Sequence, residues 1–283
     1  MKKIYAAVLA TLIFACAPAL AKKPPQAKIV PSRSVVIGGF DPAKKEDLPA
    51  LLKQLDEALP KMKAAGATSH EGYVRWGLIE PEKEGVFDFT VYDEIVKLYK
   101  KHGMKWVPFL IIGSPYSLPD WYYNSKKKQG YVCLEHGKET DVQSLWNPEM
   151  RRHVDRVIKA FAHHYAKSGV IESVLLGVTG NYGEAIYVAT MNDDWTADTH
   201  GKYHTHHGYW AADPYAVKSF RTWLRAKYKT PAALDRAWKA SFKSFDEISP
   251  ALKDKMPSDR AWYDMVTWYR ESMNSYTDFW VAS

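Results

Sequence analysis

Residues 68–112, TSHEGYVRWGLIEPEKEGVFDFTVYDEIVKLYKKHGMKWVPFLII, contain one complete strand–helix–strand pattern. The segments 68–76 and 105–112 are bounded runs rich in Val, Ile, Tyr, Phe and Trp, which is typical of strands. Between them, apolar residues recur at helical spacing from Thr90 until Gly103, a residue type that commonly ends helices. This order predicts a βαβ unit in a parallel sheet.

The same alternation continues on both sides of this unit. Two further strands are predicted at residues 34–39 and 171–178. Further helices are predicted to begin near Leu48, Asn147-Pro148, Asp213-Pro214 and Ser258. Crossovers between parallel strands are right-handed, so the strands should add in chain order. No G-x-G-x-x-G motif follows the first strand, which argues against a dinucleotide-binding fold.

Long loops follow the third and fourth strands, whereas the loops after the helices are short. This asymmetry is typical of a (βα)8 barrel, in which the loops after the strands carry the chemistry. A closed barrel needs eight strands and about 250 residues, yet residues 34–283 supply four strands. The α/β pattern therefore indicates either a complete four-stranded domain or a truncated barrel with only the first four βα units. We favour the truncated (βα)8 TIM barrel. The missing C-terminal half of the barrel would then be a partner of this chain.

The first residues resemble a bacterial secretory signal. Lys2 and Lys3 precede an apolar stretch at residues 5–15 that is too short to span a bilayer, and Ala19-Leu20-Ala21 is a cleavage motif. We therefore expect a signal peptide at residues 1–21, a flexible lead-in at 22–33, no membrane span, and a secreted or periplasmic protein. Lipid anchoring at Cys16 is the less favoured alternative.

Composition and charge narrow the possible partners. Hydrophobic residues make up 46% of the chain and charged residues 25%, which is ordinary for a globular protein. The formal charge of +7 would fall to 7 − 2 = +5 if cleavage after Ala21 removed two lysines. The lysines and arginines of the chain are scattered, so we expect no nucleic-acid partner. Cleavage would also leave Cys133 as the only cysteine, which excludes an internal disulfide.

The chemistry is expected at the end of the fourth strand. The segment GVTGNYGEA, residues 177–185, contains three glycines, one amide and one acid, Glu184. Glycine allows sharp turns and close approach to a ligand. A carboxyl group at the end of a barrel strand, among aromatic rings, is placed to act as a general acid. The alternative is a turn in which Glu184 caps the next segment.

Aromatic residues, which make up 14% of the chain, are frequent in the loops after the strands. The apolar faces of sugar rings stack on Trp and Tyr, and their hydroxyl groups need Asn, Arg and His as partners. The expected substrate-binding residues are Arg75, Trp76, Tyr116, Trp121, Asn181, Tyr182, His207 and Trp210. For Trp76, burial in the core is an open alternative.

Several stretches resemble known glycoside hydrolases with (βα)8 barrels. RWGLIEPEKEGVFDFTVYDEIVKLYKKHGMKWVPFL (75–110), PDWYYN (119–124) and FRTWLRAKYKTPAALDRAWKASFKSFDEISP (220–250) resemble the family 42 β-galactosidases. SGVIESVLLGVTGNYGEAIY (168–187) is similar to the family 14 β-amylases, in which a Gly-Glu pair supplies the general acid. Family 42 instead has Asn directly before its catalytic Glu, whereas here Tyr-Gly separates Asn181 from Glu184.

The resemblance implies hydrolysis of a glycosidic bond by two carboxyl groups, with Glu184 as the proton donor. In this clan the second carboxyl group comes from a late strand, and no late strand is predicted here. We therefore expect a carbohydrate substrate and an isolated chain that is inactive. A non-catalytic carbohydrate-binding protein that keeps the cleft is the alternative function.

Four histidines lie close together in HGKYHTHHGYW, at positions 200, 204, 206 and 207. His-x-His is a workable spacing for metal ligands, but no cysteine lies nearby in the sequence. Substrate contacts or loop surface are the favoured interpretation, so we expect neither a metal nor a cofactor. Cys133 is expected to be a buried apolar residue, because no nucleophile motif surrounds it.

Overall fold

The computed structural model describes residues 34–35, 42, 44–181, 183–188 and 204–283. The chain divides into two units, residues 1–32 and 33–283, and every described residue belongs to the second unit. The predicted signal peptide and lead-in therefore lie outside the described residues. So do Tyr182 and most of the loop that precedes Trp210.

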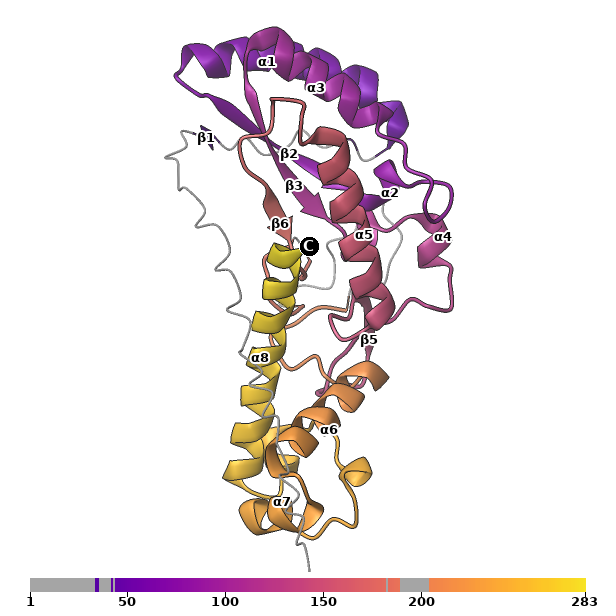
Figure 1. The fold of residues 1–283 in the computed structure, drawn as a ribbon, viewed down its shortest axis with the longest axis vertical. Helices are drawn as coiled ribbons and strands as arrows, with labels where there is room; N and C mark the ends of the chain where they lie inside the picture. The colour runs from indigo at the N-terminus through magenta and orange to yellow at the C-terminus, as the bar shows by residue number, and fades with distance from the viewer. Residues whose placement is uncertain (1–33, 36–41, 43, 182, 189–203) are drawn as a thin grey trace, which may run out of the picture. The chain divides into compact units, whose positions relative to one another are not determined.

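Four parallel strands form one sheet (Figure 1). In order across the sheet they are β1 (Ser34–Val35), β2 (Ser69–Arg75), β3 (Lys105–Ile111) and β6 (Leu175–Gly177). All three pairings are parallel, so the strands add in chain order as predicted. β6 is shorter than the predicted strand at residues 171–178. Ile171, the first residue of the predicted strand, forms only an isolated bridge with Trp106 of β3.

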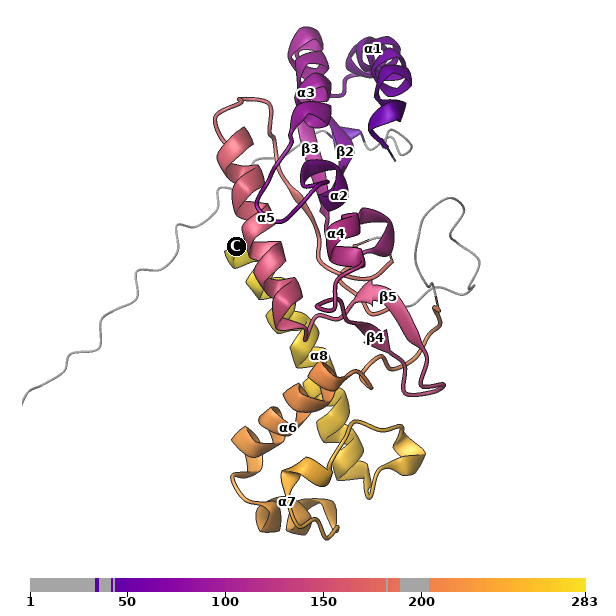
Figure 2. The ribbon, with the colours of Figure 1, turned by 90° about the vertical axis from the view of Figure 1, so that its right-hand side faces the viewer.

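Three helices follow the first three strands and cover one face of the sheet (Figure 2). They are α1 (Leu48–Ala64), α3 (Thr90–His102) and α5 (Pro148–Tyr165). Trp106 of β3 is 1% exposed and lies at the centre of the contact. Its ring centroid is 5.5–6.1 Å from those of Tyr92, Tyr99, Phe161 and Tyr165. Aromatic packing against helices therefore covers this face.

The sequence signals at four helix ends are confirmed. Gly103 ends α3 in a left-handed conformation with φ of 60°, which glycine adopts without steric cost. Asn147 caps α5 by accepting a hydrogen bond from the backbone N–H of Glu149 at 3.0 Å. Asp213 and Ser258 cap the later helices α6 and α8 in the same way.

The second face of the sheet has less cover among the described residues. The register pairs Tyr73 with Phe109 and Phe109 with Leu175, so these three side chains share a face. Tyr73 and Phe109 are half-buried, and Leu175 is 41% exposed. Parallel sheets are usually buried on both faces. The described residues therefore leave one face of this sheet incompletely covered.

A hairpin between β3 and α5 was not predicted. β4 (Gly130–Val132) pairs antiparallel with β5 (Glu139–Gln143). A Cβ atom at Gly130 would collide with the backbone oxygen of Thr140, so only glycine fits there. The remaining short elements are α2 (Trp76–Ile79), α4 (Asp120–Tyr123) and the 3-10 helices Lys45–Asp47, Pro115–Ser117, Phe245–Glu247 and Lys253–Lys255.

A second hydrophobic core lies among the last helices. These are α6 (Pro214–Tyr228), α7 (Pro231–Trp238) and α8 (Asp259–Ala282). Buried Asp264 accepts hydrogen bonds from Lys227 at 2.8 Å and from the indole of Trp238 at 2.9 Å, so its charge is compensated. Within the described ranges, every helix is too short or too polar to cross a membrane.

Candidate active site

The carboxyl ends of three strands meet at one edge of the sheet. The register aligns Arg75 of β2 with Ile111 of β3, and Ile111 with Gly177 of β6. The loops that follow these residues therefore leave the sheet side by side. In (βα)8 enzymes and open α/β sheets this edge is where ligands bind.

Glu184 lies in a tightly turned loop after β6. Gly180, Gly183 and Ala185 have φ values of 93°, 86° and 56°, so the backbone turns three times through the left-handed region. Positive φ is uncommon for alanine, and such strain is frequent at functional sites. A Cβ atom at Gly180 would lie 2.5 Å from Oε2 of Glu184, so the carboxyl group folds back over this turn. The Glu184 side chain is exposed.

Gly183 allows this loop to pack onto the strand ends. A Cβ atom at Gly183 would lie 2.6 Å from the Cα atom of Gly177 and 3.0 Å from the ring of Phe109. Both distances are shorter than ordinary van der Waals contacts. Glycine is therefore required at position 183 for two reasons: its positive φ value and its close contact with β6.

Hydrogen bonds with Ser114 and Tyr131 hold the same loop. The buried Ser114 hydroxyl lies 3.0 Å from the backbone oxygens of Gly180 and of Asn181, and it can donate to one of them at a time. The hydroxyl of Tyr131 in β4 is 3.0 Å from that of Thr179. The roles of Ser114, Tyr131 and Thr179 were not predicted. They depend on contacts between segments 48 to 67 positions apart.

Arg75 and Tyr116 form a second group at this edge. The guanidinium carbon of Arg75 lies 5.0 Å from the centroid of the Tyr116 ring, and its Nη1 donates to the Tyr116 backbone oxygen at 3.4 Å. Both side chains are half-buried. The structure thus brings Arg75 and Tyr116, two predicted site residues, together by a cation–π contact.

Trp76 and Trp210 are not placed as predicted. Both side chains are 0% exposed, so neither presents a ring face to a ligand. The Trp76 indole donates to Oε2 of buried Glu80 at 2.6 Å, and the Trp210 indole donates to the backbone oxygen of His206 at 3.3 Å. The expectation of sugar platforms at these positions is therefore corrected. For Trp76, the core alternative is what the structure shows.

Trp121 is half-buried and lies edge-on to Trp76, with ring centroids 5.5 Å apart. Its indole donates to the backbone oxygen of Glu80 at 2.8 Å. Arg156 completes this group by pairing with the Glu80 carboxylate, including an Nη2–Oε2 contact of 2.7 Å. Trp121 therefore combines an anchored N–H group with a partly accessible ring.

The other predicted site residues differ in their burial. Asn181 is 2% exposed, whereas His207 is exposed.

Glu71, which was not predicted, lies two residues before Tyr73 on the less covered face of the sheet. Partial burial raises its pKa. Its register partner is Val107, two residues before Phe109, so Glu71 lies below the carboxyl edge rather than on it.

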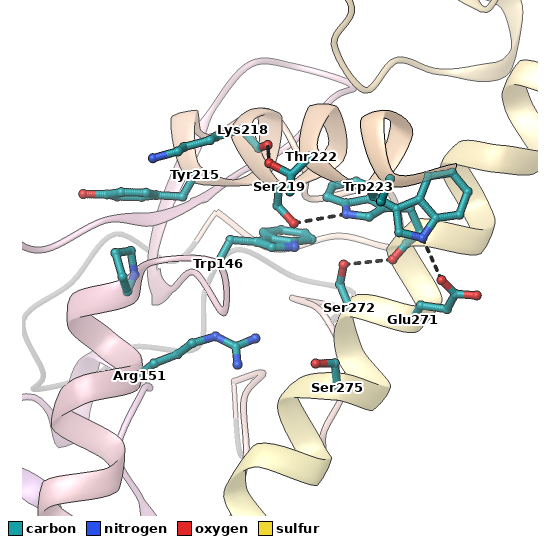
Figure 3. A pocket seen from close by; sticks show the side chains of 13 residues that line it. Trp146, Arg151, Tyr215, Lys218, Ser219, Thr222, Trp223, Glu271, Ser272 and Ser275 are labelled. Carbon is teal, nitrogen blue, oxygen red and sulfur yellow. Dashed lines mark hydrogen bonds between the residues drawn. The ribbon is translucent and has the colours of Figure 1, made fainter. Parts of the chain in front are cut away.

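A pocket of about 610 Å³ lies among α5, α6 and α8 (Figure 3). Trp146, Arg151 and Trp223 contribute to its lining, and the Trp223 indole donates to Glu271 at 2.8 Å. None of the predicted site residues lines it. This pocket is therefore distinct from the group of residues at the strand ends.

Comparison with known proteins gives a consistent result. The model of glycoside hydrolase family 42, described as β-galactosidase, matches residues 48–282. A thermophilic β-amylase of Thermoanaerobacterium thermosulfurigenes is 24% identical over 217 residues, which are 71% of this chain and 38% of that protein. The chain thus spans well under half the length of that relative.

Solved structures show the same type of fold. The catalytic domain of a β-amylase from Paenibacillus polymyxa has a TM-score of 0.69 and 21% identity, covering 88% of this chain and 61% of that one. A β-galactosidase from Bacillus circulans sp. alkalophilus has a TM-score of 0.61 and 18% identity, covering 89% of this chain and 34% of that one. The mixed α/β fold therefore resembles that of barrel glycosidases.

Proposed function

The chain belongs to glycoside hydrolase family 42, and on this basis we propose that it carries the proton-donor half of a glycosidase site. Glu184 is the general acid that protonates the leaving oxygen of a glycosidic bond. One observation carries this proposal: Glu184 lies in the strained loop at the carboxyl end of β6, packed on the ends of β3 and β6. Glu184 is the one residue of the chain for which the sequence predicts a catalytic role.

The substrate is a carbohydrate, and we propose a β-galactoside or an α-glucan. Arg75 at the end of β2 and Tyr116 in the loop after β3 are the proposed contacts to sugar hydroxyl groups. Trp121 supplies a partly accessible ring for an apolar sugar face. Asn181, Tyr182 and His207 are retained as proposed contacts in the loops after β6.

We further propose that residues 34–283 form the first four units of a (βα)8 barrel. Three observations support this: the sequential parallel order of the strands, the incomplete cover of the face that carries Leu175, and the similarity to a part of each relative. The face carrying Tyr73 and Phe109 then corresponds to the barrel interior. The second carboxyl group would come from the other half of the barrel, so this chain alone should bind sugar without cleaving it.

Residues 1–21 are proposed to direct export, in agreement with their charge and apolar pattern. Mass spectrometry of protein recovered from the periplasm should give Lys22 as the N-terminal residue. A lipid-modified Cys16, or an uncleaved Met1, would contradict this.

The test of function is a titration of the full chain with malto-oligosaccharides and galactosides, combined with turnover assays on the corresponding aryl glycosides. We expect saturable binding without turnover, and we expect Glu184→Gln, which keeps the side-chain shape, to bind as well as the wild type. Failure to bind any of these sugars would contradict the proposal. Steady turnover by a monomer that depends on Glu184 would support the donor role but contradict the half-barrel.

A further inference from the structure

Four potential metal ligands meet beside the β4–β5 hairpin. Cys133 and His136 lie in the turn of the hairpin, and His204 and His206 lie in the segment before α6. One ligand atom from each residue can be chosen so that all four lie within 4.8 Å of one another. In the sequence, 71 positions separate Cys133 from His204, so the cysteine is not near these histidines along the chain. The fold removes that separation.

The distances agree with tetrahedral coordination. The Cys133 sulfur lies 3.5 Å from Nε2 of His204 and 3.8 Å from Nδ1 of His136, and these two nitrogens are 3.3 Å apart. With Zn–S of about 2.3 Å and Zn–N of about 2.0–2.1 Å, tetrahedral angles require about 3.5–3.6 Å between S and N and about 3.3–3.4 Å between two N atoms. Two of the three distances match these values, and the Cys133–His136 distance of 3.8 Å is slightly longer, so the three atoms are close to the spacing of ligands of one small ion.

His206 supplies an independent observation. Its Nδ1 lies 3.1 Å from the backbone oxygen of His207, an acceptor, so Nδ1 carries the proton. The lone pair is then on Nε2, which is buried and has no hydrogen-bond partner in the structure. A backbone carbonyl that fixes the tautomer of a ligating histidine is the usual arrangement around a metal.

The two segments are held together before any ion binds. The backbone N–H of Leu134 donates to the oxygen of Tyr209 at 2.8 Å, and that of Ala212 donates to the oxygen of Val132 at 2.9 Å. Within the turn, the N–H of Cys133 donates to the oxygen of Lys138 at 3.0 Å. The ligands therefore stand on two segments fixed by backbone hydrogen bonds, as a preorganised site requires.

We propose that Cys133, His136, His204 and His206 bind one zinc ion. A set of one thiolate and three imidazoles suits Zn²⁺, and four protein ligands leave no open position, so the site is structural. On binding, the Cys133 thiol gives up its proton to solvent, and the zinc–thiolate pair with three neutral imidazoles has a net charge of +1.

An acidic residue lies next to the site and offsets this charge. Oε1 of Glu135 accepts a hydrogen bond from the N–H of Tyr209 at 2.9 Å. A Cβ atom at Gly208 would lie 2.7 Å from both this Oε1 and Cε1 of His206. The carboxylate therefore lies near a ligand ring. The ion would lock the hairpin, which contacts the Glu184 loop through Tyr131, onto the segment that leads into α6.

The test is metal analysis of the purified full chain, followed by replacement of the metal with cobalt. We expect about one zinc per chain after gel filtration, and a Co²⁺ form with intense tetrahedral d–d bands and a sulfur-to-cobalt charge-transfer band. The wild-type cobalt spectrum tests the site even if a variant fails to fold. A folded chain that retains no zinc, or a cobalt form without the sulfur band, would overturn the proposal.

Matched variants identify the ligands. Cys133→Ser should abolish the charge-transfer band. His204→Ala and His206→Ala should weaken zinc binding at least about tenfold, whereas His163→Ala, on the exposed side of α5, should not. Retention of the band in Cys133→Ser, or equal losses in His163→Ala and the two ligand variants, would contradict the assignment.

Discussion

Replacing Gly183 by alanine should disturb the candidate site more than the same change at Gly66. Both glycines have positive φ, 86° and 95°, so alanine costs about 1–2 kcal/mol at either position through backbone strain. A Cβ atom at Gly66 has no atom within 4 Å. At Gly183 it would lie 2.6 Å from the backbone of Gly177, which cannot move without moving β6.

The clash adds about 1–3 kcal/mol, as is common for overpacking. Urea unfolding of the two variants should therefore show Gly183→Ala as the less stable by that amount. Because the clash displaces the Glu184 loop, Gly183→Ala should also bind sugar more weakly, whereas Gly66→Ala should bind like the wild type. Equal losses of stability, with sugar binding unchanged in both variants, would refute this account of the loop.

Two further predictions concern buried side chains. Burial lowers the pKa of His70 to about 4, so the unfolded chain binds more protons between about pH 6.5 and pH 4. Acidification over this window should lower the unfolding free energy of the wild type by about 3 kcal/mol more than that of His70→Gln. Parallel pH–stability curves for the two proteins would contradict this. Trp210→Ala should cost about 3–5 kcal/mol in a thermal or urea unfolding assay, because the ring is fully buried. Trp121→Ala should cost less and should weaken sugar binding; the opposite order would show that the two roles are exchanged.

The sequence predicts the order of strands and helices well because their signals are local. Gly103, Asn147 and Asp213 mark helix ends through their own backbone or side-chain chemistry. The position of Glu184 after a predicted strand is local in the same sense. The parallel sheet then follows from chain order and crossover handedness.

The remaining features depend on contacts that periodicity does not contain. Trp210 and Trp121 are both loop aromatics in the sequence, and only tertiary packing makes the first 0% exposed and leaves the second half-buried. The need for glycine at position 183 arises from the proximity of Gly177, and the cluster around Cys133 arises from the pairing of a hairpin with a distant segment. No single stretch of sequence encodes these contacts.

The most direct test of the central claim is affinity labelling of Glu184 with epoxyalkyl glycosides. The sugar directs the reagent to the sugar-binding site, where the Glu184 carboxylate opens the epoxide and forms an ester. The epoxide oxygen takes up a proton and becomes a hydroxyl group. Peptide mapping of the full chain should find one ester, at Glu184, that excess oligosaccharide suppresses and that Glu184→Gln lacks. Comparison of the glucoside and galactoside reagents would identify the preferred sugar. Labelling spread over surface carboxylates, or none at Glu184 with either reagent, would contradict the claim that this residue is the proton donor of a sugar-binding site.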